Sequence, residues 1–148
     1  MVNEKTKFYV LKGAGNRGKS TVLFYLTNEF IADGAYILEN PYNQTVSSNN
    51  QICDYCLLIQ YKNKNIIIMS KGDDENELNK QWGNFKGIDR NIDIIIGASR
   101  TRGQTVDWWK KNFKEIEFFD NGEYMKTPME QQQYSMSQLQ KFKQKIQI

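Results

Sequence analysis

Histidine is absent from this chain of 148 residues, and cysteine and proline occur only twice each. Without histidine there is no Ser-His-Asp triad, no histidine general base and no imidazole ligand for zinc. Cys53 and Cys56 form a single Cys-x-x-Cys motif, with no second pair to complete a tetrahedral zinc site. The motif lies in a predicted strand, where odd spacing sends the two side chains to opposite faces. We therefore interpret both as reduced structural cysteines, against the alternatives of a redox pair or half a zinc site.

Long apolar runs are also missing from the sequence. No stretch approaches the ~20 residues that span a bilayer, and residues 1–5 show no pattern of a secretory signal. A hydrophobic share of 39% and a charged share of 25% are typical of a globular protein in water. We therefore predict a cytoplasmic protein without a membrane partner. It should form one domain over residues 1–148, because this length suits a single core.

The net charge of +3 is small for a chain of this size. Acidic and basic residues are interleaved along most of the sequence, and only the C-terminal tail is locally basic. Charge alone therefore does not establish a nucleic-acid partner. The apolar spacing in the tail predicts an amphipathic helix over about 131–148. We expect this helix to dock on the domain, the alternative being contact with a protein partner or nucleic acid.

Segments with strand-type and helix-type apolar spacing alternate along the chain. The predicted strands are 7–11, 35–38, 52–61, 64–70, 92–97 and 115–119. The predicted helices are 19–30, one that starts near 74, 105–113 and the terminal segment. The strands 52–61 and 64–70 are predicted to form an antiparallel hairpin with Lys62-Asn63 at its turn. The polar stretch 39–51 is expected to be a mobile loop. This order indicates an α/β fold of three layers, with a mixed, mainly parallel sheet and helices on both faces.

One motif carries the strongest chemical signal. Residues 13–20 read Gly-Ala-Gly-Asn-Arg-Gly-Lys-Ser and match the pattern G-x-x-x-x-G-K-[ST] at every defined position. A predicted strand precedes the motif and a predicted helix follows it, which is the context that the pattern requires. Glycines in such a loop let backbone N–H groups surround phosphate oxygens, while the helix amino terminus favours negative charge. The segment resembles the Walker A loop of the P-loop NTPase superfamily; the alternative is an ordinary glycine turn.

This resemblance implies a role for each residue of the loop. Lys19 would reach the β- and γ-phosphates, Ser20 would place its hydroxyl on Mg²⁺, and Thr21 would help an adjacent phosphate. The cofactors implied are Mg²⁺ and a nucleoside triphosphate, expected to be ATP. The phosphate-binding residues implied are Gly13, Ala14, Gly15, Asn16, Arg17, Gly18, Lys19, Ser20 and Thr21.

A P-loop enzyme also needs an acidic residue near the magnesium ion. Asp73 follows the strand 64–70, and the carboxyl end of a strand neighbouring the P-loop strand faces the phosphates in such folds. We predict Asp73, with Ser20, as the metal ligands, and weigh a helix-capping role for Asp73 equally. Asp74 is the favoured cap, because Glu77 follows it at capping-box spacing. The layout looks like that of Ras-like GTPases, but their D-x-x-G and N-K-x-D motifs are missing, so guanine specificity has no support.

Two arginines follow the predicted central strand 92–97. The segment resembles the G-F-P-R-T-x-x-Q segment of adenylate kinases, in which arginine meets phosphate and glutamine meets the acceptor base. The matching residues are Gly97, Arg100, Thr101 and Gln104. Arginines at the carboxyl end of a core strand are well placed to bind phosphate bidentately, whereas the alternative is a solvated basic turn. We predict Arg100 and Arg102, together with Lys19, as the catalytic residues.

These features predict a P-loop NTPase or phosphotransferase. The chain would bind a magnesium nucleoside triphosphate and either hydrolyse it or transfer its γ-phosphoryl group. Two alternatives stay open: a kinase for a small molecule or nucleotide, and a non-catalytic nucleotide-binding module that recruits a protein partner. The three differ in what Arg100 and Arg102 do.

Overall fold

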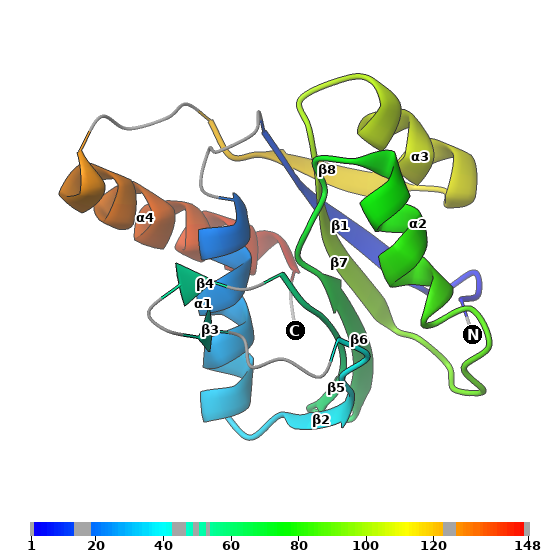
Figure 1. Ribbon diagram of the computed structural model, residues 1–148. Helices are drawn as coiled ribbons and strands as arrows, with labels where there is room; N and C mark the ends of the chain where they lie inside the picture. The colour runs from blue at the N-terminus through cyan, green and yellow to red at the C-terminus, as the bar shows by residue number, and fades with distance from the viewer. Residues whose placement is uncertain are drawn as a thin grey trace.

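The computed structural model describes residues 2–13, 19–42, 47–48, 51–52, 54–122 and 127–146. Six strands form one sheet in the order β2-β5-β6-β7-β1-β8, and two very short strands, β3 and β4, pair separately (Figure 1). The strands are β1 (Lys7–Lys12), β2 (Tyr36–Glu39), β3 (Ser47–Ser48), β4 (Gln51–Ile52), β5 (Cys56–Tyr61), β6 (Lys64–Met69), β7 (Ile94–Ser99) and β8 (Ile116–Asp120). The helices are α1 (Lys19–Ala32), α2 (Glu75–Gly83), α3 (Gln104–Asn112) and α4 (Pro128–Ile146).

The sheet is mixed rather than mainly parallel, which corrects the prediction. Strands β6, β7, β1 and β8 are parallel to one another, whereas β5 is antiparallel to both β2 and β6. The reason lies in the turn between β5 and β6. Lys62 and Asn63 both have positive φ, at 50° and 64°, which is the backbone of a two-residue hairpin turn. This turn reverses the chain, and β2 then extends the antiparallel region at the sheet edge.

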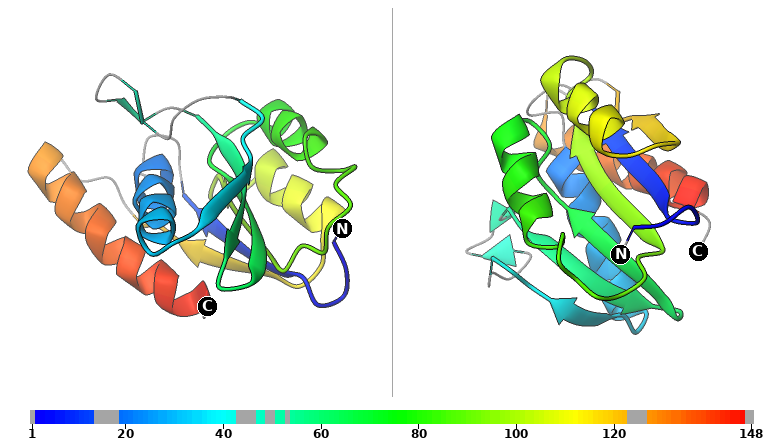
Figure 2. Two further views of the ribbon diagram at one scale, coloured as in Figure 1. Left: turned by 90° about the horizontal axis from the view of Figure 1, so that it is seen from below. Right: turned by 90° about the vertical axis from the view of Figure 1, so that its right-hand side faces the viewer.

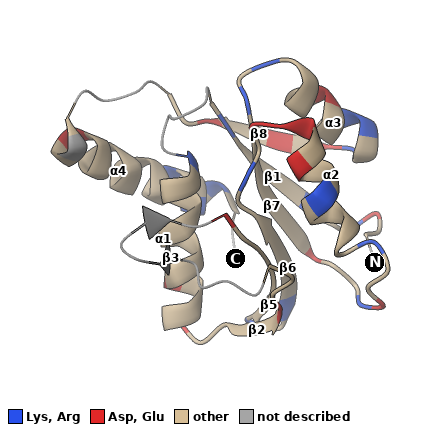
Figure 3. Cartoon of the chain, in the orientation of Figure 1, with Lys and Arg blue, Asp and Glu red and all other residues tan. Residues whose placement is uncertain are grey.

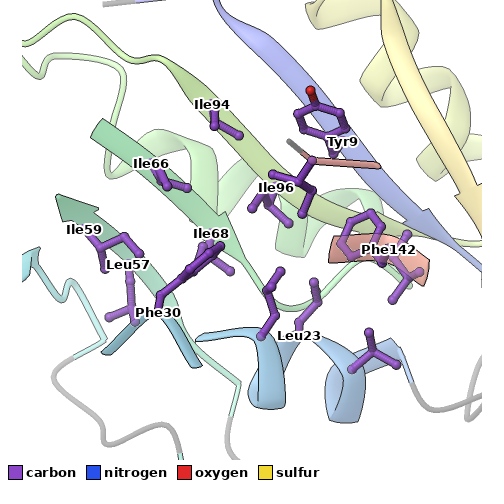
Figure 4. Packing of buried hydrophobic residues seen from close by; sticks show 14 of the residues in the cluster. Tyr9, Leu23, Phe30, Leu57, Ile59, Ile66, Ile68, Ile94, Ile96 and Phe142 are labelled. Carbon is purple, nitrogen blue, oxygen red and sulfur yellow. The ribbon is translucent and has the colours of Figure 1, made fainter. Parts of the chain in front are cut away.

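Helices cover both faces of the sheet, as predicted. Helices α1 and α4 pack together on one face, and α2 and α3 lie on the other (Figure 2). Alternate residues of the central strands supply the two cores: Ile94 and Ile96 face α1 and α4, whereas Ile95 faces α2 and α3. Figure 4 shows Leu23 and Phe142 approaching the isoleucines from the first pair of helices. Each such buried side chain contributes about 1.5–3 kcal/mol, so both helix layers are firmly attached.

Most elements lie within three residues of their predicted positions. All six residues of β7 are buried, as expected of a central strand covered on both faces. The stretch 39–51 was predicted as a mobile loop; β3 forms within it and pairs with β4, which begins at its last residue. Residues 43–46 and 49–50 lie outside the described residues. None of the helices in the described part of the chain is long and apolar enough to cross a membrane.

Candidate functional site

The candidate site lies at the carboxyl ends of the parallel strands, where α1 begins. Gly13 directly follows β1, and its N–H donates to the Ser99 carbonyl at the end of β7, at 3.0 Å. On the other side, the Asn121 N–H donates to the Lys12 carbonyl at 2.7 Å. The chain leaving β1 is therefore fixed between the ends of β7 and β8. Five of the predicted phosphate-binding residues, 14–18, lie outside the described residues.

Lys19 is the first residue of α1, and its side chain is only 5% exposed. Its ammonium donates to the Gly13 carbonyl at 2.6 Å and to the Asp73 carboxylate at 2.5 Å. Burial lowers the pKa of Lys19, the bond to Asp73 opposes that effect, and Arg100 lowers the pKa further. The site therefore holds a cation that has lost most of its water and depends on anionic oxygen for compensation.

Asp73 reaches Lys19 by a route that the sequence did not reveal. Strand β6 was expected to neighbour the strand before the loop, but β7 lies between β6 and β1. The turn after β6 crosses the end of β7 through Gly72. A Cβ atom on Gly72 would lie 1.9 Å from the Ala98 carbonyl oxygen, so only glycine allows this approach. The close backbone contact carries the Asp73 carboxylate across β7 to the head of α1.

The two adjacent aspartates divide their roles. Asp74 is the N-cap of α2, and its carboxylate accepts from the Asn76 N–H at 2.7 Å and the Glu77 N–H at 3.4 Å. This confirms Asp74 as the capping residue. Asp73 instead pairs with Lys19, and its side chain keeps 35% exposure. A half-exposed carboxylate beside a buried ammonium remains open to a second cation.

Arg100 is the predicted arginine that joins this cluster. Its Nε donates to the Asp73 carbonyl at 2.9 Å, and its own N–H donates to the Thr105 hydroxyl at 2.9 Å. The guanidinium is otherwise exposed at the rim of the site. Arg102 is also exposed, in the connection between β7 and α3, and Gln104 is exposed as the first residue of α3. Figure 3 shows basic residues in the connection that leads to α3 and acidic residues on α2.

A pocket of about 280 Å³ opens beside Asp73, between the start of α2 and the start of α3. Because Asp73 also contacts Lys19, a molecule in this pocket would lie next to the cluster of Lys19, Asp73 and Arg100. The pocket is lined by Asp73, Asp74, Glu75, Asn76, Arg100, Gln104 and Thr105.

Sequence reasoning missed an ion pair at this edge. The Lys71 ammonium lies 3.2 Å from the Asp54 carboxylate, and this hydrogen bond raises the pKa of Lys71. Asp54 precedes β5 and Lys71 follows β6, so the predicted hairpin already placed the two residues at the same end. That register was the signal that should have revealed the pair. The pair connects the start of β5 to the turn that carries Asp73.

The predicted metal ligands are Ser20 and Asp73. Ser20 and Thr21 are half-buried in the first turn of α1. Within the described ranges, no group of three or more Cys, Asp or Glu side chains is placed to hold a metal ion. Protein residues alone therefore do not form a metal site there, and an ion at Asp73 would need oxygens from a ligand.

Cys56 is a free, buried cysteine in the core under α2, and burial raises its pKa to about 12. Such a thiol is unreactive at neutral pH, which agrees with a structural role. Cys53 lies outside the described residues.

Comparison of the chain with family models, with curated proteins and with solved structures found no match. The function must therefore be argued from the chemistry of Lys19, Asp73 and Arg100 themselves.

Proposed function

We propose that this chain binds a magnesium nucleoside triphosphate, expected to be ATP, at the head of α1, and hydrolyses it or transfers its γ-phosphoryl group. The observation that carries the proposal is the buried Lys19 ammonium, held between the Gly13 carbonyl and the Asp73 carboxylate. The order of β1, the motif at 13–20 and α1 supports it further, because this is the order of a Walker A loop in a P-loop fold.

Lys19 and Asp73 would exchange partners when the nucleotide binds. In the free protein each neutralises the other. Phosphate oxygens carry more negative charge than one carboxylate, so Lys19 would turn to them and release Asp73. Asp73 and the Ser20 hydroxyl would then face the magnesium shell. The ion pair therefore keeps both groups in place for a ligand that brings an anion and a cation together.

Arg100 would supply the second positive charge. Its Nε is occupied by the Asp73 carbonyl, which fixes the guanidinium at the rim and leaves its terminal nitrogens for phosphate. Catalysis would consist of positioning and charge stabilisation, with Lys19 and Arg100 acting on the transferring group. Arg102, exposed farther along the same loop, would assist from outside this cluster.

A thermal-shift panel tests the proposal. ATP, GTP, ADP and AMP are each added with and without Mg²⁺. We expect magnesium triphosphates to stabilise the protein by about 2.7 kcal/mol at 100-fold saturation, and AMP to give no shift. Lys19→Met should lose the shift, whereas Lys12→Met, at the end of β1, should keep it. An equal shift in Lys19→Met would contradict the proposal.

The pocket beside Asp73 favours a second candidate function, transfer to an acceptor. Arg100 and Gln104 both line this pocket, and Asp73 connects it to the cluster. For a kinase, labelled γ-phosphate should appear on an added acceptor, and Gln104→Ala should weaken acceptor binding. For a hydrolase, the label should appear as inorganic phosphate and Gln104→Ala should matter little. A stabilised protein without turnover in either assay would instead identify a nucleotide-binding module that recruits a partner.

A further inference from the structure

The end of the molecule opposite the nucleotide edge has two grooves, one on each side of α4. The first lies between α4 and the sheet face of β1 and β8, and has a volume of about 550 Å³. Figure 2 shows the C-terminal half of α4 beside these strands in both views. The groove is lined by Lys7, Tyr9, Glu117, Phe119, Lys141, Gln144 and Lys145.

The second groove, of about 430 Å³, lies between α4, the end of α1 and the hairpin of β5 and β6. Gln144 lines both grooves, so they meet on the surface of α4. The second groove is lined by Phe30, Asp33, Tyr61, Lys62, Gln140, Lys143, Gln144 and Ile146. We call the two together the α4 grooves.

The charge of the α4 grooves is positive. Five exposed lysines line them, against two carboxylates, Glu117 and Asp33, and one of the five, Lys143, pairs with Glu29 at 2.8 Å. Asp33 already accepts a hydrogen bond from the Tyr61 hydroxyl. The pocket beside Asp73 has the opposite character, with three carboxylates and one arginine. The α4 grooves and the pocket beside Asp73 therefore differ in the sign of their charge.

An aromatic ring accompanies the lysines of the first groove. Phe119 is half-buried on β8 there, whereas Tyr61, at the end of β5 in the second groove, is only 7% exposed and packs against Phe30. Spacing along α4 places Lys141 and Lys145 on the side of the first groove and Lys143 on the side of the second. A positively charged groove with an aromatic ring at its floor is the combination that binds a phosphodiester backbone and an unstacked base.

We propose that the α4 grooves bind single-stranded nucleic acid, with its phosphates along the lysines and a base against Phe119. A recessed ring favours a single strand over a duplex, because only an unstacked base can enter a groove to reach it. The aromatic floor favours nucleic acid over an acidic peptide, which needs only the lysines. This inference does not depend on the proposed nucleotide site.

The test is fluorescence anisotropy of a labelled 20-nucleotide oligothymidine with the full chain. The variant carries Lys7→Glu, Lys141→Glu and Lys145→Glu. The matched control carries Lys86→Glu, Lys111→Glu and Lys114→Glu, which change the net charge equally at exposed positions outside the α4 grooves. We expect the variant to bind at least about tenfold more weakly at 50 mM salt, and the control within about twofold of the parent protein.

Salt dependence makes the test quantitative. Each phosphate contact to a single strand contributes about −0.7 to the slope of log K against log salt concentration, so losing three contacts should make the slope less negative by about 2. Phe119→Leu keeps the apolar volume but removes the ring, and should weaken oligothymidine binding about fivefold. Polyglutamate binding should be unaffected by that substitution.

Three results would overturn the proposal. Equal weakening in both triple variants would show a response to net charge alone. Polyglutamate that binds as tightly as oligothymidine would identify the grooves as a site for an acidic protein. A duplex that binds more tightly than the single strand would exclude base contacts in the grooves. Unchanged melting temperatures and Mg-ATP shifts in both triple variants verify that each is folded and that the α1 site is intact.

Discussion

The two ends of the sheet use charge in different ways. At the head of α1, one lysine is 5% exposed and donates two short hydrogen bonds, to the Gly13 carbonyl and the Asp73 carboxylate. At the α4 grooves, five lysines are exposed. A buried ammonium has lost its water, so a change in its partner has a large effect. Exposed ammoniums are hydrated and screened by salt, so each contributes little alone. Single substitutions should therefore have large effects at the first end, and only combined substitutions should at the second.

The largest effect is expected from Asp73→Asn. The variant removes the charge that would hold magnesium, so turnover should fall about 10²–10³-fold. Binding of metal-free nucleotide should become no weaker, because Lys19 loses a competing carboxylate. Steady-state phosphate release and nucleotide titrations with and without Mg²⁺ measure both effects.

Asp74→Asn is the matched control for that variant. Asparagine caps helices as well as aspartate does, so both the stability of α2 and turnover should be preserved. If Asp74→Asn lost as much activity as Asp73→Asn, the division of roles between the two aspartates would be wrong.

Gly72→Ala should have the next largest effect, on stability as well as on the site. Its Cβ would lie 1.9 Å from the Ala98 carbonyl oxygen, so the turn must shift, at a cost of about 1–3 kcal/mol. Urea denaturation measures the loss, and the Mg-ATP thermal shift should shrink with it.

Gly83→Ala is the control, because nothing lies within 4 Å of its added Cβ. It should be neutral, or stabilise by up to about 1 kcal/mol. Equal stability of Gly72→Ala and the parent protein would show that the approach of the turn to β7 is unnecessary.

A smaller effect, on the pH dependence of binding, follows from the lowered pKa of Lys19. Affinity for Mg-nucleotide should fall as the pH rises through that pKa, which lies below the ordinary value of 10.5. In the same window the unfolded chain holds more protons than the free folded protein. Lys19 therefore makes the free energy of unfolding rise with pH there. Nucleotide titrations from pH 7 to 10 measure the change in affinity.

Lys19→Arg is the control for this pH dependence. Its guanidinium keeps its charge throughout that range, so whatever affinity it retains should not decline with pH. A parallel decline in Lys19→Arg would assign the pH dependence to another group.

Local patterns predicted the elements well. The hairpin around Lys62-Asn63, the buried strand β7 and the Asp74 cap each depend on residues close together in sequence. The errors came from pairing between distant segments. Nothing near Asp73 indicates that β7 inserts between β6 and β1, because strand order is decided by the packing of the whole sheet.

In the candidate site, too, the residue set by a local motif was predicted, whereas the contacts between distant segments were not. Lys19 was identified from its motif alone, because the pattern fixes its position relative to the glycines. Its partner Asp73 was chosen for standing after a strand, and the structure brings the two together across β7. The contact of Arg100 with the Asp73 carbonyl spans 27 residues and depends on the glycine at 72, so no local pattern reveals it.

A crystal structure with magnesium and a non-hydrolysable ATP analogue tests the central claim most directly. We expect the Lys19 ammonium to leave the Asp73 carboxylate for the β- and γ-phosphates, with Asp73 and Ser20 facing the metal. A nucleotide bound elsewhere, with the 2.5 Å contact between Lys19 and Asp73 unchanged, would contradict it.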